Sequence, residues 1–247
     1  DLPGSYSIYP TSEDEAIFTK YLIEEQEKYS GVIYIADALN LKRSLLLYQQ
    51  IKDLGIPILM VINQVDLAEK RGLHIDSKKL GELLGQNILE SNAKKNIGID
   101  EIRESIFKDE FSVSDKPYFD IPSENLGLVF KISRQIEEKN FYKVWTLIAA
   151  DTYLGKLESV KTQLNQEDRK CMVPKRLQVQ ETIRRYQQID GIISQTISKK
   201  PQFKELLTEK LDKILVHPVL GYLVFGIILL TIFQSVFFIA EYPMNWI

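Results

Sequence analysis

Residues 63–66, Asn-Gln-Val-Asp, have the types and spacing needed to recognise a purine base. A fixed carboxylate such as that of Asp66 can accept hydrogen bonds from the N1–H and the exocyclic amine of guanine, and Asn63 can bridge the base and a phosphate loop. These residues end an apolar run, residues 56–62, which predicts a strand buried on both faces of a parallel sheet. Ligands of open α/β sheets bind just past such strand ends. The alternative is an ordinary strand-end turn.

Two more short motifs fit the same chemistry. Asp1 and Gly4 form the pattern D-x-x-G, in which the aspartate holds Mg²⁺ through a water molecule and the glycine N–H faces a γ-phosphate. Residues 91–94, Ser-Asn-Ala-Lys, follow a short strand predicted at residues 87–90, and the Ala93 N–H can donate to guanine O6. The alternatives are a Pro-Gly turn for the first motif and a strand-to-helix loop for the second.

The elements between these motifs predict that all three lie at one edge of a sheet. Ser12 begins a capping box, so a helix is expected from residue 13 to about residue 28. Residues 32–36 predict a second buried strand, and Asn40 is a candidate cap for the next helix, which Gly55 ends. Each motif therefore follows the carboxyl end of a strand, which favours a nucleotide site over three unrelated turns. Further helices are predicted at residues 76–84 and from residue 98.

The composition excludes several classes of function. The 247 residues carry a formal net charge of −3, which does not favour binding to nucleic acid. The single cysteine, Cys171, excludes an internal disulfide and an all-cysteine metal site and is typical of a reducing cytosol. We expect the sequence to be a piece of a longer protein, because it starts inside a motif and ends just after an apolar segment.

From about residue 108 the alternation of strands and helices ends, and helical patterns follow a loop at residues 111–123. Helices are predicted at residues 124–139, 141–148 and 175–198, which indicates a small all-α bundle. The predicted apolar stripe of the last helix consists of Val179, Ile183, Tyr186, Ile193 and Ile197, with Arg184 and Arg185 on the other side. We interpret the stripe as core and expect no catalysis there.

A membrane span is predicted near the carboxyl end. Residues 219–240 contain no charged residue, and at ~1.5 Å per residue a helix there would measure about 33 Å, against a hydrocarbon core of ~30 Å. A buried core helix is the alternative. The basic amphipathic stretch 203–215 carries Lys204, Lys210 and Lys213, which places the amino-terminal side in the cytoplasm by the positive-inside rule.

The order of the motifs at Asp1–Gly4, 63–66 and 91–94 resembles the third, fourth and fifth motifs of translation-factor-like GTPases. The longer strings DLPGSYS, ADALNLKRSLLLYQQIKDLGIPILMVINQVD and HPVLGY resemble the FeoB-type ferrous iron transport proteins of bacteria. The resemblance implies a partial α/β P-loop-type GTPase domain with a parallel sheet, followed by an all-α bundle and one transmembrane helix. It implies a GTPase domain at 1–110, a helical spacer at 111–200, an amphipathic linker at 201–217 and a first membrane helix at 218–247.

The resemblance also implies ligands and roles. Asp1 would belong to the Mg²⁺ shell and Gly4 to the γ-phosphate contact, and the residues expected to bind the guanine of GTP or GDP are Asn63, Gln64, Asp66, Ser91, Asn92 and Ala93. The implied function is the GTP-binding cytoplasmic part of an Fe²⁺ transporter in the cell inner membrane, where guanine nucleotide gates iron uptake. Implied partners are the lipid bilayer, a small FeoA-type accessory protein and a second copy of the protein, but not nucleic acid.

The sequence departs from the GTPase pattern at several places. No G-x-x-x-x-G-K-[ST] phosphate loop occurs, Gln64 replaces the lysine of N-K-x-D, and Asn92 is atypical of the last motif. Ser5 stands where many GTPases have a water-positioning glutamine, so fast hydrolysis is not expected. We expect GTPase activity in the full-length protein and none from this chain alone. The alternatives are a soluble ribosome- or RNA-associated GTPase and a membrane-tethered interaction module that has lost nucleotide binding.

Overall fold

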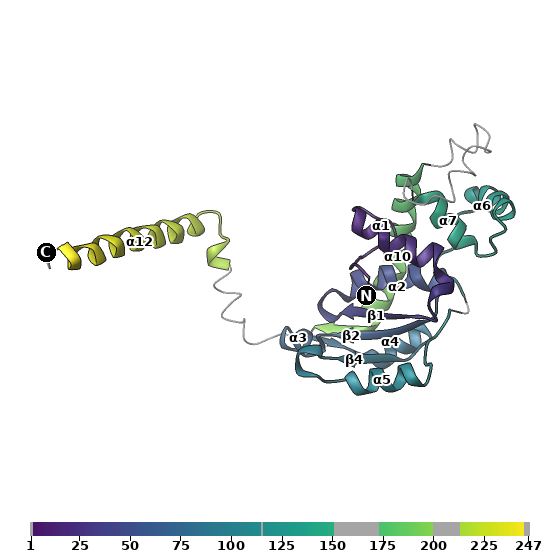
Figure 1. Ribbon diagram of the computed structural model, residues 1–247, viewed down its shortest axis with the longest axis horizontal. Coiled ribbons are helices and arrows are strands. Elements are labelled where there is room, and N and C mark those ends of the chain that lie inside the picture. Colours follow the sequence, from purple (N-terminus) through teal and green to yellow (C-terminus); the bar gives the residue numbers. More distant parts are fainter. Residues whose placement is uncertain (1, 115, 151–172, 200–212, 245–247) are drawn as a thin grey trace. The chain divides into compact units, whose positions relative to one another are not determined.

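The computed structural model describes residues 2–114, 116–150, 173–199 and 213–244, in two compact units, Asp1–Lys200 and Pro201–Ile247 (Figure 1). The first unit is built on a parallel three-stranded sheet of order β1-β2-β4. Its strands are β1 (Val32–Asp37), β2 (Ile58–Asn63) and β4 (Ile88–Ser91). The predicted parallel sheet is therefore confirmed, with strand boundaries shifted by one or two residues.

The central strand β2 is buried as its sequence predicts. Its five apolar residues, 58–62, are at most 1% exposed, because a strand on either side and helices on the faces cover them. In Figure 1, α2 (Leu41–Asp53) and α5 (Ile99–Phe107) lie on opposite sides of the sheet; α2 contacts β1, and α5 contacts β2 and β4. The register aligns Asp37, Asn63 and Ser91 at the carboxyl ends of the three strands.

The first two helices confirm one predicted cap and correct another. α1 (Glu13–Glu24) begins as predicted, since Ser12 Oγ accepts a hydrogen bond from the Glu15 N–H at 3.3 Å, but it ends before residue 28. Asn40 occupies the N-cap position of α2 as predicted, but its side chain makes no capping hydrogen bond. Asn40 Nδ2 instead donates to the Asp37 carboxylate at 2.7 Å, and that carboxylate caps the preceding 3₁₀ turn by accepting from the Leu39 N–H at 2.9 Å.

Between the two base-recognition motifs the structure adds two short elements that the sequence patterns did not predict. α3 (Val65–Lys70) and β3 (Leu73–Ile75) follow β2 directly. α4 (Ser77–Leu84) was predicted; the Asp76 carboxylate caps its start by accepting from the Lys79 N–H at 2.9 Å.

Three helices form the bundle in the described residues. They are α6 (Ser123–Gln135), α7 (Phe141–Ala149) and α10 (Pro174–Thr196), and α10 packs against α2, α4 and α7 (Figure 1). After α10 the chain forms β5 (Ile197–Lys199), which pairs antiparallel with β3, where the sequence patterns predicted more helix.

The predicted apolar stripe of α10 is confirmed for Tyr186, Ile193 and Ile197, which pack against the core, and is wrong for its other two members. Val179 and Ile183 are 55% and 54% exposed, whereas Arg185 is fully buried. The buried residues of α10 are Leu177, Glu181, Arg185, Ile189 and Thr196. The charged pair among these residues finds partners on other elements, which a pattern of apolar residues within one helix does not reveal.

The second unit contains α12 (Leu220–Met244). His217 lies just before it, and its Nδ1 accepts hydrogen bonds from the N–H groups of Val219 and Leu220, each at 3.2 Å. Among the residues that the structure describes, no helix is both long and apolar enough to cross a membrane. Cys171, Lys204 and Lys210 lie outside the described residues.

Candidate functional site

The side chain of Asn63 joins the two base-recognition motifs. Its Oδ1 accepts hydrogen bonds from Ser91 Oγ and from the Ala93 N–H, each at 3.2 Å. Asn63 and Ser91 are the last residues of β2 and β4 and are partners in the parallel register. The pairing of the strands therefore brings together residues that lie 28 positions apart in the sequence.

Gln64 sets the direction in which the chain leaves the sheet. It has a left-handed backbone conformation, with φ at 66°, which is uncommon for a residue other than glycine. Its N–H donates to the Ser91 carbonyl at 3.1 Å, while its carbonyl accepts from the N–H of Leu67 at 3.0 Å and begins α3. The side chain of Gln64 is exposed. Its main-chain contacts place Asp66 in the first turn of α3, above the strand ends.

The Asp66 carboxylate is held by two lysines. Its Oδ2 lies 2.9 Å from Lys95 Nζ and 3.9 Å from Lys70 Nζ, and the Asp66 side chain is 32% exposed. The hydrogen bond from Lys95, and then the lysine charges, lower the pKa of Asp66 below its ordinary value. The carboxylate is therefore ionised at neutral pH and acts only as a hydrogen-bond acceptor, the state that pairing with two guanine donors requires. Lys95 was not among the predicted residues.

Asn92 and Gly98 shape the loop after β4. Asn92 Oδ1 accepts from the Lys95 N–H at 3.1 Å, so in this structure Asn92 caps a 3₁₀ turn at residues 93–95. Gly98 has φ at +79°, and a Cβ there would lie 2.1 Å from the Glu90 carbonyl oxygen, so only glycine fits. The tight turn between β4 and α5 holds Ala93 at the exposed edge of the site. The Ala93 N–H already donates to Asn63, so a guanine O6 would share that donor.

Of the predicted phosphate and magnesium residues, the structure describes Gly4 alone. Gly4 is exposed, and a Cβ placed there would meet no atom within 4 Å. Asp1 lies outside the described residues. Within the described part of the chain no three His, Cys, Asp or Glu side chains gather into a possible metal site. The magnesium site at Asp1 stays a prediction.

Comparison with known proteins decides the family. Residues 1–106 match the family model described as ferrous iron transport protein B. The Fe(2+) transporter FeoB of Leptospira biflexa is 31% identical over all of this chain and 37% of its own length. That of Legionella pneumophila strain Paris is 30% identical over 91% of this chain and 30% of its own length. The chain belongs to the FeoB family. It spans about a third of the length of these curated relatives.

Solved structures of FeoB cytosolic domains have the same fold. The cytosolic domain of L. pneumophila FeoB matches with a TM-score of 0.65 and 28% identity, over 81% of this chain and 79% of that one. The T. maritima FeoB cytosolic domain in a GMPPNP form matches with a TM-score of 0.64 and 21% identity, over 81% of this chain and 79% of that one. At that identity the second match shows the fold alone. The partial α/β domain expected from the FeoB resemblance is thus confirmed.

In this FeoB-family chain, a buried polar network ties the residues behind Gly4 to the helical bundle. The Tyr9 hydroxyl donates to the Glu181 carboxylate on α10. The Ile8 N–H donates to Gln50 Oε1 at 2.9 Å, and Gln50 Nε2 donates to Glu181 Oε1 at 3.2 Å. Segment 8–9, α2 and α10 are therefore joined through one carboxylate. Sequence patterns gave no signal for this network, because its members lie up to 172 positions apart.

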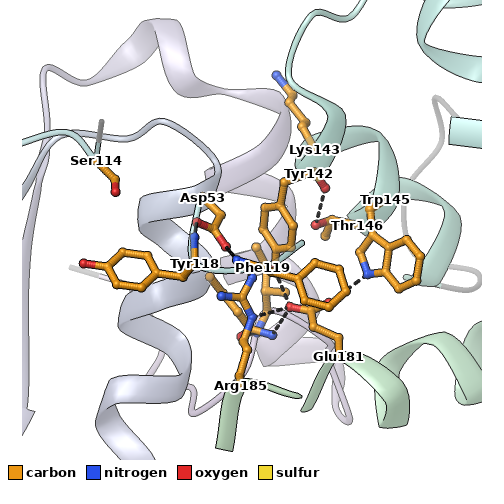
Figure 2. A network of polar contacts seen from close by, with 12 residues as sticks. Asp53, Ser114, Tyr118, Phe119, Tyr142, Lys143, Trp145, Thr146, Glu181 and Arg185 are labelled. Atoms are coloured by element: carbon orange, nitrogen blue, oxygen red, sulfur yellow. Dashed lines mark hydrogen bonds and ion pairs between the residues drawn. The ribbon is translucent and has the colours of Figure 1, made fainter. Parts of the chain in front are cut away.

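Arg185 is the centre of the charges in that network (Figure 2). Its guanidinium lies 2.7 Å from Asp53 Oδ2 and 2.7 Å from Glu181 Oε1, and all three side chains are fully buried. The Tyr142 hydroxyl and Trp145 Nε1 from α7 donate to Glu181 at 2.7 Å and 2.8 Å. Burial raises the pKa of Asp53, and the Arg185 charge opposes that rise. We assign this network to holding the bundle on the α/β domain.

Proposed function

We propose that the α/β domain binds a guanine nucleotide, GDP or GTP, at the carboxyl edge of its sheet. Asp66 accepts from the guanine N1–H and exocyclic amine, and Asn63 holds the loop of Ser91 and Ala93 against the base. The observation that carries this proposal is the ionised Asp66 carboxylate next to the Asn63 bridge. Support also comes from T. maritima FeoB domains described in GDP and GMPPNP forms.

The remaining roles in this proposal follow from position. Gln64 orients α3 through its backbone, and Asn92 caps the loop that presents Ala93 to the O6 of guanine. Gly4 contacts the γ-phosphate, and Asp1 holds Mg²⁺ through a water molecule. When bound, the Mg²⁺ ion neutralises charge on the β- and γ-phosphates.

Substitution of Asp66 tests the base recognition. Both guanine donors would bond to a charged acceptor, and such hydrogen bonds contribute more to binding than neutral ones, although the partial exposure of Asp66 reduces that contribution. Asp66→Asn in the full-length protein should therefore weaken GDP binding about 100-fold. It should strengthen XDP binding, because the amide donates to the C2 oxygen of xanthine. Titration calorimetry with GDP, XDP and ADP measures both effects.

Asp100→Asn is the matched control, because Asp100 is 88% exposed and contacts only Arg103 among the ion pairs of the described residues. The control should leave both affinities unchanged. Equal binding of GDP and ADP by the unsubstituted protein would refute guanine recognition. An unchanged GDP-to-XDP preference in Asp66→Asn would refute the role of Asp66.

We further propose that the full-length protein is an Fe²⁺ transporter of the cell inner membrane whose nucleotide state gates iron passage. The support is the similarity to curated Fe(2+) transporters. A fusion of Fe(2+) transport protein A with FeoB in Porphyromonas gingivalis, 25% identical over all of this chain and 32% of its own length, favours an FeoA-type partner. Assembly with a second copy is part of the same proposal, as is coupling of the GTPase domain to the membrane through the bundle that contains α6, α7 and α10.

The membrane proposal places a span at residues 219–240, with the GTPase side in the cytoplasm. The proposal rests on the uncharged sequence of residues 219–240, and the described side chains of this stretch are predominantly exposed and apolar, Phe225 and Leu230 among them. Membranes carrying the full-length protein should retain it after carbonate extraction, and protease mapping should find the region before Lys213 on the cytoplasmic side. Release of the protein by carbonate would refute the span.

A further inference from the structure

The antiparallel sheet of β3 and β5 connects the base-recognition loop to the end of the first unit. Only Arg71 and Gly72 separate α3, which carries Asp66, from β3. The partner strand, β5, directly follows α10 and ends at Lys199, one residue before the end of the first unit. Two three-residue strands thus link the backbone of the guanine site to the chain that leads on to α12.

The register of this sheet identifies which groups hold it together. It pairs Leu73 with Lys199, His74 with Ser198, and Ile75 with Ile197. The Asp76 N–H donates to the Thr196 carbonyl at 2.8 Å, and hydrogen-bonded pairs alternate with non-hydrogen-bonded pairs in an antiparallel ladder. The pair of His74 and Ser198 is therefore hydrogen-bonded. The N–H of Lys199 points away from β3.

The geometry leaves α3 little freedom to move independently of β3. α3 has six residues; the Gln64 backbone fixes its start, and its middle packs through the fully buried Ala68. At the far end, Ile75 of β3 is buried against the core, and Ile197 of β5 packs beside it. In this one conformation, the contacts of Asn63 with Ser91 and Ala93 coexist with a formed β3–β5 ladder.

We propose that β5 is the output element of the nucleotide site: bound guanine nucleotide stabilises the β3–β5 pairing, and the pairing stabilises the base-recognition loop. This inference rests on the proposed guanine binding. By thermodynamic linkage the two effects are equal in size, so a change that breaks the ladder must weaken nucleotide binding. The nucleotide state then reaches residues 200 onward through the backbone of β5.

Two proline substitutions in the full-length protein separate this coupling from a general effect on the chain. Ser198→Pro removes the N–H that donates to His74, whereas Lys199→Pro removes an N–H that points away from the ladder. Ser198→Pro should raise the Kd for GDP about fivefold or more, and Lys199→Pro should change it less than about twofold. Thermal melting of both variants checks that each one folds.

A second measurement needs no substitution. Hydrogen exchange of the amides at residues 73–76 and 197–199 should slow about fivefold or more when GDP is added and should not respond to ADP. Exchange that GDP leaves unchanged, or a folded Ser198→Pro variant with the unsubstituted Kd, would overturn the coupling while guanine binding stands. A parent protein that does not bind GDP would overturn both proposals.

Discussion

Replacement of Arg185 by methionine tests whether the buried network holds the helical bundle on the α/β domain. Arg185 pairs with Asp53 from α2 and with Glu181 on its own helix, both at 2.7 Å and at zero exposure. Methionine keeps much of the length and apolar volume of the arginine stem, but it leaves two carboxylates facing one another without a cation. The substitution therefore isolates the charge from the packing of the side chain.

The size of the effect follows from what the two carboxylates retain. Removing one partner of a buried ion pair costs about 3–5 kcal/mol. Here Asp53 still accepts from the N–H groups of Tyr118 and Phe119, and Glu181 still accepts from Tyr142 and other side chains, so we expect the lower end, about 3 kcal/mol. With a urea slope of about 1–3 kcal/mol per molar, the midpoint should fall by about 1–3 M.

Urea unfolding followed by tryptophan fluorescence is a suitable assay, because Trp145 is fully buried and donates to Glu181. Arg184→Met is the matched control, since Arg184 directly precedes Arg185 on α10. Among the hydrogen bonds described, Arg184 makes only an exposed one, to the Asp120 carbonyl at 3.3 Å. The loss in Arg185→Met should also be smaller at acidic pH, where Asp53, whose pKa is raised by burial, takes up a proton. If both variants lose equal stability, the network does not hold the bundle.

Two further predictions concern the pH response of the network and the loop after β4. Because burial raises the pKa of Asp53 above its ordinary value of 3.8, the folded protein binds a proton at Asp53 more tightly than the unfolded protein does. The contribution of Asp53 to stability therefore falls as the pH rises from its ordinary pKa through its folded pKa. The urea midpoint of the parent relative to Asp53→Asn should decline as the pH rises above about 4. Gly98→Ala should lower stability by at least about 2 kcal/mol in thermal melting, through a strained φ and the clash with the Glu90 carbonyl, whereas Gly127→Ala, with open space around its Cβ, should not.

The parts of the fold that could be predicted are those that local sequence encodes. β2 is a run of apolar residues and is buried from end to end, and Ser12 and Gly85 mark helix ends where the capping rules place them. The approach of Asn63 to Ser91 followed from a general property of parallel sheets, whose strand ends meet at one edge. The proximity of residues 63–66 to residues 91–94 could therefore be predicted before their contacts were known.

The parts that could not be predicted depend on partners far away in the sequence. β3 and β5 have three residues each and become strands only because they meet, with more than 120 positions between them. Lys95 lies in a lysine pair that reads as a solvated turn until Asp66 comes within 2.9 Å. The exposed Val179 and Ile183 were taken for core because an apolar stripe is the usual sign of a buried helix face.

The buried face of α10 bears on how a signal from the nucleotide could travel. Leu177, Glu181, Arg185 and Ile189 recur every fourth residue, and the two charged members bond to residues of α2 and α7 and to Tyr9. A hinge between the sheet and α10 would expose or orphan these charges at a cost of several kcal/mol. The described part of Asp1–Lys200 therefore moves most easily as one body. The ladder of β3 and β5 is short, is held by few hydrogen bonds and ends at Lys199. A change at Asp66 can therefore alter the chain at this ladder without breaking the contacts of the rest of the unit.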